Sequence, residues 1–188
     1  MVERCPDKTE VVGSIPTLPT MFFTSHLLAG GAIGAVTGEP VSAFLLGIVS
    51  HHLLDRTPHT DIGTYYWGRW AKLGVDRSNF MIARPLDWAV GLTDLAIGTA
   101  IALMIWPQTG YSMPVLFGAL GAVLPDLIDN GPFIQRLFRK TKFGKAYHEF
   151  HWRFHSTASP KIWYIGLLTQ VAIIVLALWL LLVGSSYF

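Results

Sequence analysis

The sequence predicts an all-α membrane protein, a polytopic bundle of about five transmembrane helices with a His/Asp cluster at its cytoplasmic end. Composition is the first reason, because 52% of the 188 residues are hydrophobic and only 14% are charged. A mean hydropathy of +0.44 is too high for an ordinary soluble domain, which needs a charged surface. The other two reasons are apolar runs of spanning length and a one-sided distribution of basic residues. The length fits one domain, so residues 1–188 are expected to form a single transmembrane domain.

Five apolar runs follow one another along the chain. A helix of about 20 residues crosses roughly 30 Å of hydrocarbon at about 1.5 Å per residue. The predicted spans are residues 21–37, 40–55, 86–106, 113–129 and 161–184.

The first, second and fourth spans are short and carry small residues, which let helix backbones approach closely inside a membrane. These residues are Ala29, Gly30, Gly31 and Gly34, then Ser42, Ala43 and Gly47, then Gly118, Ala119, Gly121 and Ala122. The third span is closed by Pro107. The fifth span is uncharged and begins with Trp163 and Tyr164, as expected of aromatic side chains at a membrane interface.

Every lysine and arginine lies in residues 1–20, 55–85 or 129–161. With five spans these segments share one side of the membrane, and the connections on the other side carry no basic residue. The positive-inside rule then places the N-terminus in the cytoplasm and the C-terminus outside, in a multi-pass protein of the inner (cytoplasmic) membrane. Setting topology and contacting membrane lipids account for the basic residues, so no nucleic acid partner is expected.

Histidines and aspartates recur where predicted helices meet the cytoplasmic side. The residues at this depth are His26, His51, His52, Asp55, Asp126, Asp129, His148, His151 and His155. Spacings of three, four and seven place members of each group on one helix face. Ionisable groups within a membrane are costly and need partners, so we expect these side chains to meet. The roles of His59, Asp87 and Asp94 stay open.

Imidazole and carboxylate ligands suit Zn²⁺ or Mn²⁺. The nine residues are therefore the predicted metal ligands, and because they exceed the needs of one tetrahedral ion, a centre of two ions is reasonable. Such centres activate water and hold phosphoryl or acyl oxygens. A carboxylate or histidine that binds no metal ion, either Asp55 or His52, would then act as general base, and Arg153 is the arginine best placed to hold a phosphate.

Two stretches of the chain align without gaps. Gly47–Asp55 pairs with Gly121–Asp129, so that His52 matches Asp126 and Asp55 matches Asp129. An internal duplication and chance both account for this alignment.

Three motifs resemble a known family. The segments Thr24–Gly30, Leu124–Asp129 and Arg153–Ser156 are similar to motifs of the YdjM-like inner-membrane proteins, described as membrane-bound metal-dependent hydrolases. The resemblance implies a helical membrane fold and metal-dependent hydrolysis with no substrate specified. It places His26, the two aspartates of the second segment, and His155 with His151 at the family's motif positions.

Several functions stay open on the sequence alone. The chain is expected to hydrolyse a lipid or other phosphoester with metal-activated water. The alternatives are a transporter of metal ions or protons, a non-catalytic metal-binding membrane scaffold, and a haem protein, which the many aspartates disfavour. The oligomeric state is not predicted.

Overall fold

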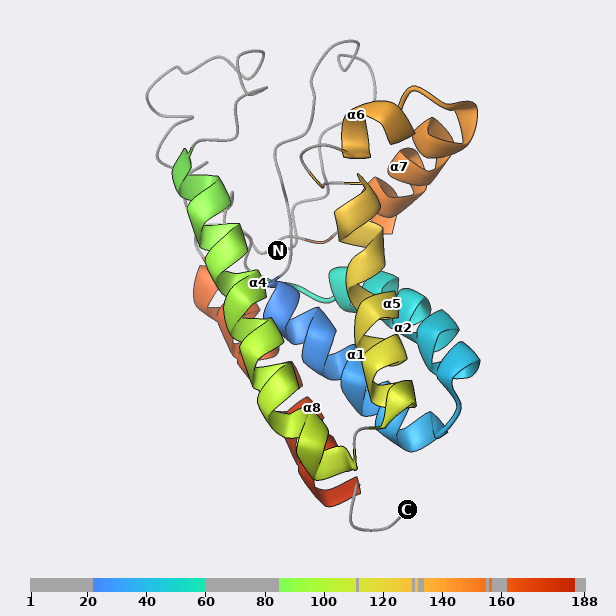
Figure 1. Ribbon diagram of the computed structural model, residues 1–188. Helices are drawn as coiled ribbons and strands as arrows, with labels where there is room; N and C mark the ends of the chain where they lie inside the picture. The colour runs from blue at the N-terminus through green and yellow to red at the C-terminus, as the bar shows by residue number, and fades with distance from the viewer. Residues whose placement is uncertain are drawn as a thin grey trace.

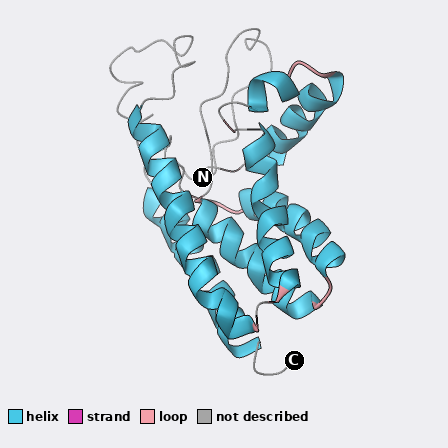
Figure 2. Cartoon of the chain, in the orientation of Figure 1, coloured by secondary structure: helices cyan, strands magenta, loops and turns pink. Residues whose placement is uncertain are grey.

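The structure, a computed structural model, describes residues 22–59, 85–110, 112–129, 131, 134–154, 156 and 162–184. All its regular elements are helices (Figure 1, Figure 2), so the all-α prediction is confirmed for this part of the chain. The elements are α1 (Phe23–Thr37), α2 (Pro40–Asp55), α4 (Pro85–Ile105), the 3₁₀ turn η3 (Trp106–Thr109), α5 (Met113–Asp129), α6 (Ile134–Phe138), α7 (Lys142–Phe154) and α8 (Trp163–Gly184).

Helix α1 is the centre of the bundle. It packs against α2, α4, α5 and α8, while α2 and α5 also pack extensively against each other. In Figure 1, α4 and α8 lie on one side of α1, and α2 and α5 lie on the other. The short α6 and the longer α7 lie beyond the C-terminal end of α5 and contact α5 and α2 respectively.

Helices α1, α2 and α5 touch through backbone atoms at glycines. A Cβ on Gly30 would meet the carbonyl oxygen of Gly118, and a Cβ on Gly118 would meet that of Gly30. A Cβ on Gly47 would also meet the Gly118 carbonyl, and one on Gly121 would meet the carbonyl of Phe44. Small residues at crossing points allow this approach, as expected from the sequence. The interior parts of the three helices are thereby held close together.

A tight turn makes α1 and α2 antiparallel neighbours. Gly38 adopts a left-handed conformation, with φ of 67°, and its N–H donates to the carbonyl of Gly34 at 3.1 Å. Glu39 then caps α2 by accepting hydrogen bonds from the backbone N–H groups of Val41 at 2.8 Å and Ser42 at 2.6 Å. The turn returns the chain along α1, so the end of α2 comes back to the start of α1.

Helix α5 contains a proline, Pro125, just before Asp126. Proline has no N–H, so the carbonyl four residues earlier lacks its usual helical donor. The helix nevertheless continues to Asp129, because packing on both α1 and α2 holds it in place.

Apolar side chains form a core inside the bundle and also cover much of its outer surface. One apolar cluster joins α1, α4, α5 and α8, and it contains Leu28, Ala32, Ile105, Val115, Ala177 and Leu181. Large apolar side chains also point outward, among them Met104 at 73% exposure and Leu168 at 65%. Among the described residues, one helix is long and apolar enough to cross a membrane, over Tyr164–Val183 of α8.

Candidate metal centre

Four helices deliver histidine and aspartate to one buried cluster. His26 comes from the first turn of α1, and α2 supplies His51, His52 and Asp55 at its C-terminal end. Asp126 and Asp129 end α5, and α7 supplies His148 and His151. His26 and His51 are fully buried, and the three aspartates are at most 2% exposed. The expected convergence of these side chains is present, because antiparallel packing brings these helix ends together.

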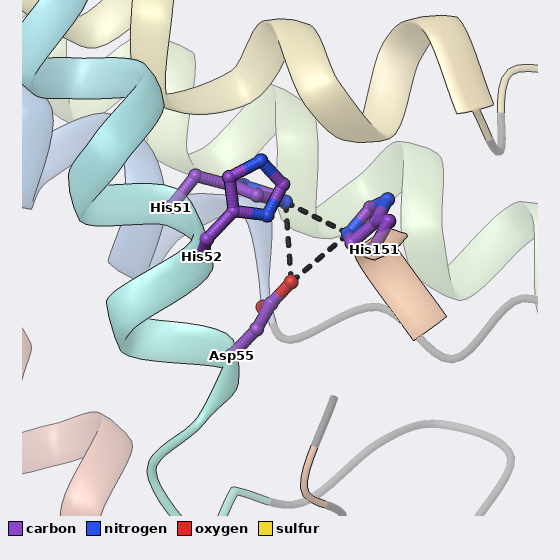
Figure 3. A group of neighbouring side chains, drawn as sticks. All are labelled: His51, His52, Asp55 and His151. Atoms are coloured by element: carbon purple, nitrogen blue, oxygen red, sulfur yellow. Dashed lines mark hydrogen bonds and ion pairs between the residues drawn. The ribbon is translucent and has the colours of Figure 1, made fainter. Parts of the chain in front are cut away.

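The heart of the cluster is a triangle of three atoms (Figure 3). Oδ2 of Asp55 lies 3.0 Å from Nε2 of His151 and 3.2 Å from Nε2 of His51, and the two nitrogens are 3.1 Å apart. Ligand atoms at about 2.0–2.1 Å from one tetrahedral Zn²⁺ lie about 3.3 Å from one another. The spacing of the three atoms therefore fits a metal ion between them.

Two groups of side chains have the geometry of a metal site. His51, His52, Asp55 and His151 form the first, and His26, His51 and Asp126 form the second, each with ligand atoms within 4.8 Å of one another. His51 belongs to both groups.

Asp55 also reaches toward the second group. Its Oδ1 lies 3.3 Å from Nε2 of His26, while its Oδ2 faces the first group. One carboxylate thus presents an oxygen to each group. The cluster can hold a metal ion, and its donors are the imidazoles and carboxylates that zinc and manganese accept.

Hydrogen bonds on the far nitrogens orient the two central imidazoles. Nδ1 of His51 lies 2.8 Å from the carbonyl oxygen of Ala122, so this nitrogen carries the proton and donates it. Nδ1 of His151 lies 3.1 Å from Oδ2 of Asp129. In both rings Nε2 is left facing Asp55, which is the arrangement of metal-ligating histidines supported by an outer partner.

Asp129, a predicted ligand, meets His151 on the ring nitrogen that is turned away from Asp55, and its role as a ligand stays a prediction. Its carboxylate accepts hydrogen bonds from Nδ1 of His148 at 2.8 Å, Nδ1 of His151 at 3.1 Å and Nε of Arg139 at 3.0 Å. Arg139 also donates to the backbone carbonyl of Asp129. Asp129 and His148 lie outside both metal-site groups. Both residues are close to the centre and hold α7 against the end of α5.

His52 lies between the cluster and an aromatic surface on α7. Its Nε2 is 3.3 Å from the hydroxyl of Tyr147, and its ring makes an edge contact with Phe150 at 5.1 Å between centroids. Nδ1 of His52 has no hydrogen-bond partner in the described chain. If Nε2–H donates to the phenol oxygen, the lone pair of Nδ1 is left either to bind a metal ion or to accept a proton.

The carboxylates change the titration of the α7 side chains. Burial alone would lower the pKa of His151, but hydrogen bonds to Asp129 and Asp55 and the charge of Asp126 raise the pKa to about 10. Burial, together with the charges of the three aspartates, raises the pKa of Tyr147 well above its usual value. At neutral pH, Tyr147 is therefore a neutral phenol, and His151 carries a proton when no metal ion binds it.

The other candidate residues lie in different places. Arg153 is exposed on α7, and His155 lies outside the described residues. His59 is buried, and its Nδ1 lies 2.8 Å from the carbonyl of Thr57. Asp94 on α4 accepts a 2.7 Å hydrogen bond from the hydroxyl of Thr24, so it ties α4 to the start of α1. Asp87 lies in the first turn of α4, where side chains are not described.

Sequence reasoning missed three parts of the site. Arg139, Tyr147 and the carbonyl of Ala122 all contact predicted ligands, and none of them lies in a recognisable motif. Tyr147 had one available signal, because it precedes His148 by one residue and His151 by four. A backbone carbonyl carries no sequence signal at all.

Fold and site together define a helical protein with a buried His/Asp centre that can hold a metal ion. No family model, curated protein or solved structure matches the chain.

Proposed function

We propose that this protein is a multi-pass membrane hydrolase that uses a divalent metal centre, Zn²⁺ or Mn²⁺, to hydrolyse a phosphoester at the cytoplasmic face of the inner membrane. Membership of the YdjM-like family and the topology with an outside C-terminus are parts of the same proposal. The observation that carries it is the position of Asp55. This carboxylate is 1% exposed and lies between two ligand groups that share His51, as expected of a bridging ligand in a centre of two ions.

The exposed apolar surface supports several spans. Helix α8 has spanning length, and α4 has 21 residues, which corresponds to about 31 Å at 1.5 Å per residue. Helices α1, α2 and α5 are shorter, but α2 exposes Val41, Leu45 and Val49 at 63%, 56% and 51%. Outward apolar surface of this extent needs a bilayer or a partner to cover it.

The donor set determines what each residue would do. His51, His151 and Oδ2 of Asp55 would hold one ion, and His26, Asp126 and Oδ1 of Asp55 would hold a second, while His52 would stay free of both ions. The metal would supply water activation at neutral pH and neutralise charge on the phosphoryl group. Ala122 and Asp129 fix the orientation of the two central imidazoles.

Proton transfer is assigned to His52. Its second nitrogen is already bonded to Tyr147, and its ring is 9% exposed, whereas both oxygens of Asp55 face histidines. His52 is therefore the better of the two predicted general bases. Arg153 is exposed on α7, the helix that carries His151, and a phosphate approaching from the cytoplasm would meet it.

A transporter fits the structure less well than a hydrolase. Buried ionisable side chains lie at one end of the bundle, and the apolar cluster of α1, α4, α5 and α8 fills the other end. A transport path needs polar groups along the whole membrane depth. Metal content alone does not separate a hydrolase from a scaffold, so the test needs an activity measurement as well.

The test compares wild type with Asp55→Asn and Asp94→Asn. Each protein is purified in detergent, its metal content is measured by elemental analysis, and phosphate release is followed from a panel of soluble phosphoesters with added Zn²⁺ or Mn²⁺. Asp94→Asn is the matched control, because Asp94 is bonded to Thr24 on α1 and belongs to neither ligand group.

We expect metal and activity in wild type and in Asp94→Asn, and loss of both in Asp55→Asn, with size-exclusion profile and helical circular dichroism unchanged. Metal without phosphate release from any ester would refute the hydrolase and favour the scaffold. Absence of metal from wild type, even after reconstitution, would refute the centre itself.

A further inference from the structure

An apolar groove lies beside the candidate metal centre. It has a volume of about 480 Å³ and is lined by side chains of α1, α2 and α8. Its lining is aliphatic apart from Thr37 and Ser50. Both hydroxyls donate within their own helices, to the carbonyl of Ile33 at 3.0 Å and to that of Gly47 at 2.7 Å. Because both hydroxyl groups already donate hydrogen bonds within their helices, the groove suits a hydrocarbon chain.

Helix α1 forms the floor of the groove, where Ala29 and Ala32 are small, while Leu46 of α2 and Leu180 of α8 belong to the two walls. Helices α2 and α8 both lean on α1 and make few contacts with each other. The trough between them is thus open along its length, and one of its walls is the helix that can cross a membrane.

One end of the groove lies near His26 of the candidate metal centre. Ala29, which lines the groove, follows His26 by three residues and therefore shares its face of α1. From Ala29 to Thr37 the floor extends for eight residues, or about 12 Å at 1.5 Å per residue. A chain lying in the groove would therefore begin near His26 and run away from it along the bundle.

The surface at the same end suits a negatively charged lipid headgroup. Helix α7 exposes Lys142, Lys145 and Arg153, and it also exposes Phe143 at 72% and Phe150 at 43%. Basic and aromatic side chains on one amphipathic helix are typical of a segment at the interface of an anionic membrane.

We propose that the groove binds an acyl chain of an anionic membrane lipid and directs its phosphate ester to the metal centre. The substrate class is therefore a lipid phosphoester, and this assignment rests on the hydrolase proposed above. A soluble phosphoester has no part that would fill an aliphatic groove next to the ligands. A lipid in the bilayer can enter from the side, because the groove is open along α8.

The binding step is tested without any activity. Protein is reconstituted in phosphatidylcholine vesicles that contain phosphatidic acid with a photoreactive diazirine in its acyl chain. After illumination, labelled peptides are mapped by mass spectrometry. We expect labels at the groove residues of α1 and α2 in excess over the outward residues Leu45 and Val49, which touch only bulk lipid.

Two neighbouring leucines provide a matched pair of variants. Leu46 lines the groove and is 45% exposed, while Leu45 faces outward and is 56% exposed. Leu46→Trp should reduce labelling of α1 about tenfold, which corresponds to about 1.4 kcal/mol. Leu45→Trp should leave it unchanged. Ala29→Phe fills the floor from another helix and should act like Leu46→Trp.

Hydrolysis assays separate the two proposals. With long-chain phosphatidic acid in mixed micelles and p-nitrophenyl phosphate as the soluble ester, Leu46→Trp should slow hydrolysis of the lipid alone. Equal effects on both esters, or on neither, would overturn the groove assignment and leave the hydrolase standing. Groove labelling with no hydrolysis of either ester would refute the hydrolase and leave an acyl-chain site. The inference would be overturned if the labels were spread evenly over all outward helix faces. It would also be overturned if cross-linked dimers showed that a second copy of the chain covers the groove.

Discussion

Asp129→Asn tests whether this residue orients His151 or binds the metal itself. The variant keeps the size of the side chain and removes its charge. In the structure the carboxylate accepts from His148, His151 and Arg139 at 2.8–3.1 Å and is 2% exposed. An amide has one acceptor oxygen, so it cannot satisfy the three donors. Loss of such an outer partner typically weakens metal binding about 10- to 100-fold, or about 1.4–2.7 kcal/mol.

The measurement is a competition titration of purified protein with Zn²⁺ against a chelator of known affinity. We expect Asp129→Asn to bind the same number of ions as wild type with about 10- to 100-fold lower affinity. His151→Ala, which removes the imidazole, should lower the number of ions bound. If Asp129→Asn also lost an ion while its helix content and thermal melt stayed normal, Asp129 would be a ligand. An unchanged affinity would show that this contact does not orient His151.

Three further predictions concern packing and pH. Gly118→Ala places a methyl group against the carbonyl of Gly30, so it should destabilise the bundle by about 1–3 kcal/mol, measured by thermal melting in detergent. The control is Gly91→Ala, which should have little effect because a Cβ at Gly91 meets nothing within 4 Å. Hydrogen bonds from the backbone and side chain of Ser42 and from the backbone of Val41 lower the pKa of Glu39 in the folded protein. Ionised Glu39 therefore stabilises the fold at pH values above its unfolded pKa of about 4.5, and this stability is lost as the pH falls through the lower folded pKa. Glu39→Gln should lose this acid dependence in melts recorded against pH, and an identical pH profile would contradict the cap. The pKa of His151 is about 10 in the metal-free protein, so metal binding near neutral pH should release its proton. The metal affinity should therefore rise with pH, and calorimetry in buffers of different ionisation enthalpy should detect the released proton. A metal affinity that is independent of pH between about 7 and 9 would contradict this prediction.

The helices follow closely from the sequence. Helices α2 and α5 begin and end at the residues that the apolar runs predicted, Pro40–Asp55 and Met113–Asp129. Pro40 and Asp129 mark abrupt changes of composition, and hydrophobic patterning detects such changes well. The number of membrane crossings is another matter, because it depends on the bilayer rather than on helix boundaries, and five spans stay a prediction.

The sequence did not predict which of the aspartates lie in the two ligand groups. Asp126 and Asp129 have the same spacing as His52 and Asp55, and that spacing predicts only a shared helix face. Which member touches an ion depends on the position of α7, since Asp129 is turned to His148 and His151 by that helix. The docking of α7 depends on tertiary contacts, such as the hydrogen bond from the backbone N–H of Ser156 to the carbonyl of Asp55 at 2.8 Å.

The hydrogen bond from His51 to the carbonyl of Ala122 affects how a mutational scan of this protein would read. The acceptor is a main-chain atom, and every replacement of the Ala122 side chain leaves it in place. A scan would therefore score position 122 only for the space its side chain occupies, at 0% exposure. Replacing the peptide linkage after Ala122 with an ester, by chemical ligation or an unnatural α-hydroxy acid, would weaken this acceptor directly. Among ordinary amino-acid substitutions, a change at Pro125 would come closest to this effect, because Pro125 influences the conformation of the α5 backbone that carries the Ala122 carbonyl.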